Sequence, residues 1–537
     1  SCLTASGKVD DEKNLLIAIG AYQDRNDVTT SGTVLLIYAG VNQTGKSDDV
    51  TLKHIAPPPQ TYGLDQPKYR FGARCRSSLV AGSFVVVSSD MDDSVAKLEP
   101  PTEAVFIFQR GLVDPDTFTM VAEFNSTVMA ALFGDNDLVS DNFGKALEVD
   151  DRGIVFIGDG SNARVYEIRH NASSHGTWYV HAAHSSPSGY KDGFGAALAV
   201  SGNLLAVGRP YFGGLLGGVV VYEFNETSNE YELHSTLTLD SPEYSGVYLA
   251  GQVVGIDALA ADSGASSPVT LAASLLSWRS SRGAVATYMW NETAGDWMFD
   301  ALIEYPGAQP GDLFGHNLRM RNGTMAIFSI LANNYQGYGH LYERTSLSSS
   351  PVAGFAVPPP PSPPPPAPSP PPAPIDSSPP PPVAPPQVWQ TPSGVGTWLR
   401  IKELGIPPQF RIPREEPDTP VNFDLSEVRL SLFGVSVAML EGAVVVGAPF
   451  ASFAGTPHGA FLPFVTTSAG NANRSYVDAF PRSRRAGAGA ESEIRLAVVD
   501  DQDVLRRLGG DKVHVVVMTE ADPLSLPEVF GFLQSGG

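Results

Sequence analysis

Cysteine is nearly absent from this 537-residue chain, which has only two, Cys2 and Cys75. Taken alone, so little cysteine fits a reducing compartment. Basic residues are also scarce: 35 Lys and Arg stand against 57 Asp and Glu, which gives a formal net charge of −22. Phosphate backbones and anionic lipid repel a polyanion of this kind, so we expect no nucleic-acid partner.

Long apolar runs are missing as well. No stretch approaches the roughly 20 apolar residues that span a bilayer, so we expect no membrane span. No basic-then-apolar signal sequence precedes Ser1, which indicates a mature or trimmed product.

Several motifs of catalysis and metal binding are equally absent. The chain has no Gly-x-Ser-x-Gly elbow, no His-Glu-x-x-His and no Cys-x-x-Cys. His181 and His184 share one strand region but lack a clear third metal ligand. Glu415 and Glu416 lie in a proline-rich loop without rigid support for acid–base chemistry. We therefore predict that the chain is not an enzyme and holds no cofactor.

What the chain does contain is an internal repeat that begins with Phe-Gly and continues as a short alternating run, a tight turn, an apolar run and a Gly-led aromatic run. The pairs are Phe71–Gly72, Phe143–Gly144, Phe194–Gly195, Phe314–Gly315 and Phe433–Gly434. Degenerate copies at the N-terminus and near Tyr248 bring the number of units to seven. Each unit predicts four antiparallel strands, and radial repetition of such units predicts an all-β, seven-bladed β-propeller. The alternative is a β-sandwich in which the Phe-Gly pairs are coincidental.

The Phe-Gly units resemble FG-GAP repeats, the blades of integrin α-chain heads and of secreted adhesion proteins. The resemblance covers most of the chain and is weakest in the first and fifth copies. Many such blades carry an Asp-rich calcium loop between the first two strands. Here that place holds short turns, such as Val200 to Asn203, with too few oxygen ligands, so calcium binding is not carried over. Two acidic groups could chelate calcium weakly or form solvated loops; they are Asp90, Asp92 and Asp93, and Asp135, Asp137 and Asp141.

Seven N-x-[ST] sequons recur along the chain and favour the secretory pathway over a reducing compartment. Their asparagines are Asn42, Asn125, Asn171, Asn225, Asn291, Asn322 and Asn473. Four of them, Asn42, Asn171, Asn225 and Asn291, follow the third strand of a unit, at the predicted blade rim. A covalent N-glycan would stay in water there, and the alternative is unoccupied surface asparagine.

Proline dominates the segment 358–386, in runs such as PPPPSPPPPAPSPPPAP. Such a run lacks the donors for a helix or sheet and predicts polyproline II, about 90 Å long at ~3.1 Å per residue. It falls between the third strand of unit six and an aromatic-led fourth strand, GTWLRIKEL. We therefore expect an arm inserted in one blade; the alternative is a linker between two domains.

The interrupted Ser-Pro and Ala-Pro runs are similar to those of hydroxyproline-rich glycoproteins of green-algal and plant walls. The resemblance implies hydroxylated, O-glycosylated proline at positions such as Pro358, Pro363, Pro370 and Pro379. An intracellular ligand for SH3 or WW domains has the same composition but does not suit the sequons.

These features divide the chain into four parts: propeller units one to six (1–347), the proline arm (348–388), the end of unit six with unit seven (389–480), and a basic loop with two strands (481–537). Cys2 and Cys75 fall at similar places in units one and two, which allows either a disulfide between blades or two buried thiols. The last strands either close the ring or begin something truncated.

From these observations the sequence predicts a non-catalytic structural glycoprotein of an extracellular matrix, cell wall or ciliary-surface filament. Its partners would be other matrix or filament glycoproteins, including copies of itself. The alternatives are an adhesion or recognition receptor that binds a protein or glycan through face loops and a carbohydrate-active propeller enzyme. An enzyme would need convergent carboxylates in a central pocket.

Overall fold

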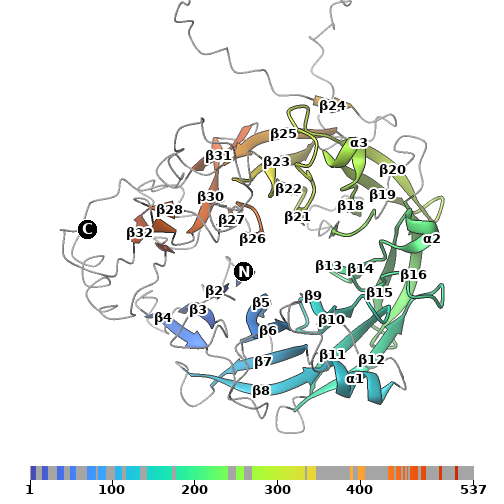
Figure 1. Ribbon diagram of the computed structural model, residues 1–537, viewed down its shortest axis with the longest axis vertical. Helices are drawn as coiled ribbons and strands as arrows, with labels where there is room; N and C mark the ends of the chain where they lie inside the picture. Colours follow the sequence, from blue (N-terminus) through green and yellow to red (C-terminus); the bar gives the residue numbers. More distant parts are fainter. Residues whose placement is uncertain are drawn as a thin grey trace, which may run out of the picture.

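The computed structural model is a seven-bladed β-propeller (Figure 1). Within the described residues, seven antiparallel sheets follow one another along the chain and surround a central axis; six have four strands and the sheet of blade six has five. The predicted fold class is confirmed.

The structure describes residues 2–7, 15–21, 33–40, 49–55, 69–79, 83–91, 103–111, 117–133, 142–171, 177–239, 250–258, 269–332, 336–345, 388–390, 397–405, 433–440, 443–448, 452–453, 456–457, 460–469, 473–478, 495–498 and 514–517.

Each blade is a meander whose strands follow one another from the axis to the rim. The innermost strands are β1 (Cys2–Gly7), β5 (Tyr69–Ser78), β9 (Phe143–Val149), β13 (Ala197–Ser201), β17 (Val254–Asp257), β21 (Asn317–Arg321) and β26 (Ser436–Leu440). The second strands are β2 (Leu15–Ala21), β6 (Phe84–Met91), β10 (Val155–Asp159), β14 (Leu204–Gly208), β18 (Thr270–Ser274), β22 (Thr324–Ser329) and β27 (Ala443–Ala448). The third strands are β3 (Thr33–Gly40), β7 (Ala104–Arg110), β11 (Arg164–Asn171), β15 (Gly218–Asn225), β19 (Val285–Asn291), β23 (Tyr338–Thr345) and β30 (Ala460–Ala469). The outermost are β4 (Asp49–Ile55), β8 (Phe118–Asn125), β12 (Thr177–Ser185), β16 (Glu230–Thr238), β20 (Asp296–Ile303), β25 (Thr397–Leu404) and β31 (Asn473–Asp478).

Three short helices and a few small strands complete the described elements. Helix α1 (Ser126–Leu132) follows β8, while α2 (Phe212–Leu215) and α3 (Trp278–Ser281) lie between the second and third strands of blades four and five. Two two-stranded sheets are formed by β28 (Ser452–Phe453) with β29 (Thr456–Pro457) and by β32 (Arg495–Val498) with β33 (His514–Val517).

The ring closes through its innermost strands. Every innermost strand contacts the next one around the axis, and β26 of blade seven contacts β1 of blade one. The C-terminal hairpin of β32 and β33 instead contacts β30 in blade seven. Closure therefore rests on blades seven and one, and not on the last two strands of the chain.

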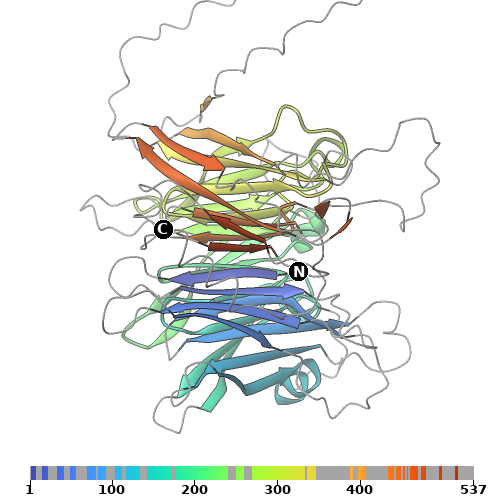
Figure 2. The same cartoon turned by 90° about the vertical axis from the view of Figure 1, so that its left-hand side faces the viewer.

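The meander gives the propeller two different faces, because its strands run from one face to the other (Figure 2). Turns between first and second strands and between third and fourth strands share one end, as in residues 201–204 and 225–230 of blade four. We call this the turn face. The connections between second and third strands, such as 209–217, and between blades, such as 186–196, form the opposite loop face.

The proline arm belongs to blade six by its connections. β23 pairs antiparallel with β25, with Gly339 opposite Leu404 and Thr345 opposite Thr397. Residues 346–396 are thus inserted between the third and fourth strands of this blade. Of them the structure describes β24 (Val388–Gln390), which pairs with β25 as a fifth strand. The proline-rich residues 358–386, including Pro358, Pro363, Pro370 and Pro379, lie outside the described residues.

Burial explains the sequence pattern of the strands. β10, β14, β18 and β22 are buried along their whole length, because each lies inside a sheet covered on both faces by neighbouring blades. Outermost strands alternate instead, and an aromatic ring near the start of four of them is buried. These rings belong to Trp178, Tyr231, Trp297 and Trp398.

The Phe-Gly pairs lock neighbouring blades together. All five Phe side chains are at most 1% exposed. Phe194, for example, packs in one cluster with Phe156 of blade three and Leu205 of blade four. Its partner Gly195 has φ +92°, and a Cβ there would come within 2.3 Å of the Arg164 carbonyl oxygen in blade three. Only glycine combines this backbone conformation with so close an approach.

We expect Gly195→Ala to destabilise the fold by about 4 kcal/mol or more, since it adds a clash with a neighbouring backbone to the strain of positive φ. Gly189→Ala is the matched control, because Gly189 also has positive φ (+69°) but an added Cβ would meet nothing within 4 Å. The control should lose only about 1 to 2 kcal/mol. Urea unfolding of both variants measures the difference; equal losses would show that blade contact does not require this glycine.

A candidate anion-binding site on the propeller axis

Three innermost strands from opposite sides of the ring bring charged side chains together on the axis. They are Arg76 of β5, Glu148 of β9 and Arg319 of β21. Each stands five positions after the Phe of its own Phe-Gly pair, so the repeat places all three at one level. The same position in blades four and seven holds Ala199 and Ala438. These two alanines are small, so they leave room on the axis for the charged side chains.

Arg76 and Glu148 form a two-pronged ion pair between neighbouring blades. Arg76 Nε donates to Glu148 Oε2 at 2.9 Å, and Nη2 donates to Oε1 at 2.6 Å. Arg76 Nη1 donates to the carbonyl oxygen of Cys75 at 2.8 Å. Both charged side chains are mostly buried, with 17% and 14% exposed. This parallel arrangement is the strong, geometrically specific form of a carboxylate–guanidinium contact.

Arg319 reaches the same carboxylate from the far side of the axis. Its Nη1 lies 3.5 Å from Glu148 Oε1, although β9 and β21 are separated by two blades on one side of the ring and three on the other. In the part of the chain that the structure describes, Arg319 donates no hydrogen bond, and about a quarter of its side chain (27%) is exposed. The guanidinium of Arg319 is therefore attracted to the carboxylate of Glu148, but its five N–H donors have no close acceptor among the described residues.

The surroundings of Arg319 are electropositive. Burial lowers the pKa of Arg319 to about 10; Arg76 and Arg74 add to the shift and Glu148 opposes it. Arg74 of β5 is exposed and donates through Nε to the carbonyl oxygen of Lys145 at 3.1 Å. His316, just before β21, has its pKa lowered by burial and then by Arg74. Two arginines thus contact one carboxylate on the axis of a strongly acidic protein, and a third, Arg74, adds its positive charge nearby.

This arrangement is suited to holding an anion. A half-buried guanidinium whose donors lack acceptors gains most from a charge-assisted hydrogen bond to an oxyanion. Arg74 and His316 lie near the starts of their repeats, which is the end of the innermost strands at the loop face. The axial site is defined by Arg74, Arg76, Glu148, His316 and Arg319, and it extends from the level of the ion pairs toward the loop face.

Known motifs and convergent carboxylates, which usually indicate a site in a sequence, do not reveal any of these five residues. The axial site rests on arginines from repeats that are far apart in the chain. A signal was present: aligning the repeats on their Phe-Gly pairs puts Arg76, Glu148 and Arg319 in one column. In the other two Phe-Gly repeats this column holds alanine. Charged residues at such a position indicate a role in electrostatic contacts and not in packing.

The sequons that the sequence predicted as modification sites differ in their structural roles. Asn171, Asn225 and Asn291 are the last residues of the third strands β11, β15 and β19, in adjacent blades. Asn225 Oδ1 accepts the N–H groups of Thr227 and Ser228, and Asn291 Oδ1 does the same for its own turn. These side chains shape hairpin turns on the turn face.

The remaining sequons stand elsewhere. Asn125 caps helix α1, its Oδ1 accepting the N–H of Val128 at 2.8 Å, at the loop-face end of β8. Asn322 is an exposed turn residue with φ +49°, a conformation that asparagine tolerates well. Asn473 begins β31, also at the turn face, and Asn42 lies outside the described residues.

Cys75 is buried and disulfide-bonded. The chain's other cysteine, Cys2, begins β1, which contacts β5. The side chain of Cys2 lies outside the described part, so the pairing of Cys2 with Cys75 stays a prediction.

Metal ligands do not gather in the described residues, where no group of three or more His, Cys, Asp or Glu is placed to hold an ion. The acidic residues considered for weak calcium binding lie outside the described residues except Asp90 in β6. His184 pairs instead with Glu167, their atoms Nε2 and Oε2 being 3.1 Å apart.

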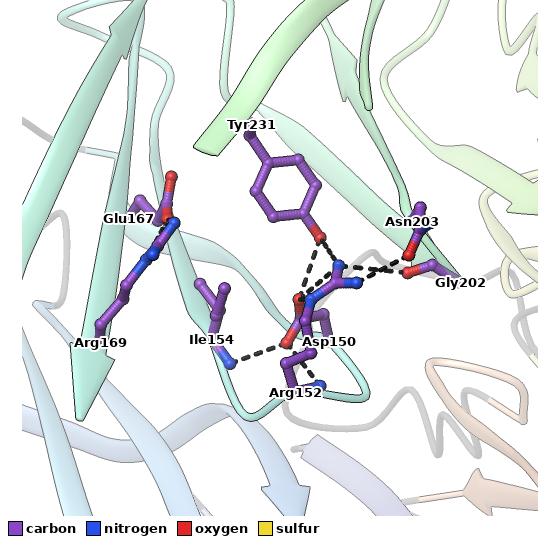
Figure 3. Close-up of polar contacts among 8 residues, drawn as sticks. All are labelled: Asp150, Arg152, Ile154, Glu167, Arg169, Gly202, Asn203 and Tyr231. Carbon is purple, nitrogen blue, oxygen red and sulfur yellow. Dashed lines mark hydrogen bonds and ion pairs between the residues drawn. The ribbon is translucent and has the colours of Figure 1, made fainter. Parts of the chain in front are cut away.

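A second polar cluster, between blades three and four, has a structural role (Figure 3). Asp150 accepts the backbone N–H groups of Arg152 and Ile154 at 2.9 and 2.8 Å, and the Tyr231 hydroxyl at 3.0 Å. Arg152 also donates to Tyr231 and to Asn203 of the next blade. Burial raises the pKa of Asp150 above its ordinary value, although these hydrogen bonds and the charge of Arg152 act in the opposite direction. The carboxylate of Asp150 and the guanidinium of Arg152 already have hydrogen-bond partners within the protein. The cluster therefore links two blades and is not suited to binding a ligand.

Blade six contains a third unusual polar group. His340 of β23 is fully buried, and neither ring nitrogen has a hydrogen-bond partner. The rings of Tyr305, Phe314 and Tyr338 surround it at centroid distances of 4.3 to 5.9 Å. Burial, followed by the charge of Arg400, lowers the pKa of His340 to about 3. The imidazole is therefore a neutral core residue.

This histidine should make the fold sensitive to acid. The unfolded chain takes up a proton at His340 below about pH 6.5, whereas the folded protein does so only near pH 3, so stability falls as the pH drops through that window. The contribution is about 1.4 kcal/mol per pH unit. We expect His340→Phe to flatten the pH dependence of the free energy of unfolding between pH 6 and 4. His181→Phe, on the rim strand β12, is the control for the loss of a histidine that is not fully buried. An unchanged slope in His340→Phe would contradict the assignment.

No helix among the described residues has the length and apolar character to cross a membrane. No family model matches the chain, and no curated protein matches it. Among solved structures, a protein from Lactobacillus plantarum is 10% identical with a TM-score of 0.32, covering 62% of this chain and 92% of that chain. A proposed 6-phosphogluconolactonase from Bacteroides uniformis is 16% identical (TM-score 0.36; 64% and 80%), and Sqt1 from Chaetomium thermophilum is 10% identical (TM-score 0.34; 62% and 66%).

These comparisons correct the function expected from the sequence. Of the three similar structures described here, one is a proposed lactonase and none is described as a matrix glycoprotein, so they give no support to a structural role in a matrix, wall or filament. That expectation rested on composition, namely the proline run and the sequons, which describe surface chemistry and not a role. The expectation of a matrix role is wrong, and the likenesses themselves assign no activity to this chain.

Proposed function

We propose that this chain is a non-enzymatic binding protein that holds a small anionic ligand on the axis of its propeller. The observation that carries the proposal is Arg319, whose guanidinium lies partly buried beside two other arginines and makes no hydrogen bond within the described residues. Desolvating a cation without an acceptor costs free energy, and a bound oxyanion restores it.

Replacement of Arg319 tests the proposal. Arg319→Gln should lower the affinity for citrate or sulfate by about tenfold to a hundredfold, because a charge-assisted hydrogen bond contributes about 1.5 to 3 kcal/mol. Isothermal titration at low ionic strength measures this, since salt screens such contacts. Arg279→Gln is the matched control: this arginine of α3 is 61% exposed and lies outside the axial site. Equal affinities of the wild type and the Arg319 variant, or an equal loss in the control, would refute the axial site.

The expected secretory location and N-glycosylation belong to the same proposal. Their support is the placement of Asn171, Asn225 and Asn291 at one equivalent turn of three adjacent blades, all on the turn face. The hydroxyl-bearing residues Thr227 and Thr293 of two of these sequons are exposed. N-glycans there would project from the turn face into water.

A sequon variant separates glycosylation from a purely structural asparagine. Thr227→Ala removes the sequon but keeps Asn225, whose Oδ1 accepts backbone N–H groups, so the turn should persist. We expect protein secreted from a eukaryotic host to lose the mass of one N-glycan. The matched control Ser228→Ala loses a hydrogen bond to Glu232 but keeps the sequon, and should keep its glycan. Identical masses for wild type and Thr227→Ala after secretion would show that Asn225 is unmodified.

Two resemblances complete the proposal. The blades are of FG-GAP type, supported by the buried Phe and the positive φ of Gly in all five Phe-Gly pairs. The proline arm is a hydroxylated, O-glycosylated segment, supported by its Ser-Pro and Ala-Pro pattern alone.

A further inference from the structure

We infer that Asn322–Gly323 is a site of spontaneous deamidation and that Asp257 of the neighbouring blade keeps it unreactive in the folded protein. The inference is independent of the axial site. Asn322–Gly323 is the single Asn-Gly pair in the sequence. It forms the turn between β21 and β22 of blade six, whereas Asp257 is the last residue of β17 in blade five.

The geometry of the turn explains why this pair is present. Arg321 pairs with Thr324, so the two residues between them reverse the chain. Both have positive φ, +49° for Asn322 and +71° for Gly323. Asn-Gly is a preferred pair for such a two-residue hairpin turn, because asparagine tolerates a positive φ and glycine has no Cβ. The blade therefore uses a dipeptide that is also chemically labile.

Deamidation is a ring closure between the two residues. The backbone nitrogen of Gly323 loses its proton and attacks Cγ of Asn322; a C–N bond forms, the Cγ–Nδ2 bond breaks, and Nδ2 leaves as ammonia with that proton. Water then opens the succinimide ring to give aspartate or isoaspartate. Glycine in the second place favours the attack, since it has no side chain to obstruct it. Such chemistry makes asparagine a thermolabile residue in proteins.

Asp257 holds both N–H groups of the turn. Its Oδ2 accepts the N–H of Gly323 at 2.6 Å, and its Oδ1 accepts the N–H of Asn322 at 3.2 Å. Burial raises the pKa of Asp257, whereas these two donors favour its ionised form. Asp257 is 3% exposed and Gly323 is buried as well, so water has little access to these hydrogen bonds.

These contacts disfavour the attack in two ways. The nitrogen of Gly323 would have to lose the proton that it donates to Asp257, and the resulting amide anion would be repelled by the carboxylate. Any rotation of this peptide plane toward Cγ of Asn322 would also break the hydrogen bond to Oδ2. Deamidation at position 322 therefore requires local opening of the contact between blades five and six.

Peptide mass spectrometry of the full chain measures the deamidation rate at position 322. The protein is produced in a bacterial host, so that no N-glycan occupies Nδ2 of Asn322, and is incubated at mildly alkaline pH. We expect the folded wild type to react at least about tenfold more slowly than the chain unfolded in urea, because only the locally open turn reacts. Asp257→Asn keeps the side-chain size but provides one acceptor for two N–H groups, and should raise the rate in the folded protein about tenfold.

Asp150→Asn is the matched control. Asp150 is also 3% exposed and accepts the backbone N–H groups of Arg152 and Ile154, but its turn has no Asn-Gly pair. This variant should leave the rate at position 322 within about twofold of wild type, because the two sites share no partner. An equal increase in both variants would trace the reaction to general destabilisation and overturn the role of Asp257. An unchanged rate in Asp257→Asn would overturn it too.

A second measurement does not require that Asp257→Asn folds. In the wild type, the amide hydrogen of Gly323 should exchange with solvent at least about tenfold more slowly than in the unfolded chain, since Asp257 holds it. Exchange at the unfolded rate would contradict the protection. If position 322 stays an amide even in the chain unfolded in urea, it is not a deamidation site and the inference fails. None of these outcomes bears on anion binding, which titration tests separately.

Discussion

The close approach of neighbouring blades is the constraint on which this structure depends. No single sheet can bury both of its faces, so each blade is stable only because the next one covers it. The Phe-Gly pairs make that contact possible where the blades crowd together, with a buried ring filling the gap and a glycine admitting the neighbouring backbone. Gly195 against the Arg164 carbonyl oxygen shows how little room remains. Everything that stands on the innermost strands is consequently held in a fixed place.

The axial site follows from that rigidity. Residues five positions after each Phe share one level around the axis because the blades share one geometry. Arg76 and Glu148 can then meet from neighbouring blades, and Arg319 can face them from across the ring. On a flexible loop, three like charges would move apart into water. The innermost strands are held by their neighbours, so the three arginines stay close together and continue to repel one another. An anion that binds between them would reduce this repulsion, which favours its binding.

The sequence predicted the fold well because the repeat is local. A Phe-Gly pair, a turn such as Ser201-Gly202-Asn203 and an aromatic near the start of the outermost strand, such as Tyr231, all lie within a single repeat unit. The axial site is not local: Glu148 and Arg319 belong to the third and sixth blades, and their contact requires the number of blades and the register of every innermost strand. Motif searches have no means of representing that contact. The expected matrix role failed for a different reason, since proline content and sequons report on surface chemistry and not on a partner.

The contrast between the acidic protein and its basic axis also limits which kinds of anion could be the proposed ligand. With a net charge of −22, the surface repels an approaching polyanion over the first several ångströms of solution, and salt screens this repulsion only beyond roughly 8 to 10 Å. A long anionic polymer would place many charges against that surface and only a few against the arginines. A small anion instead brings its whole charge into the site and leaves none outside it. The same charge distribution that led us to expect no nucleic-acid partner therefore favours a compact anion as the proposed ligand, held where the blades converge.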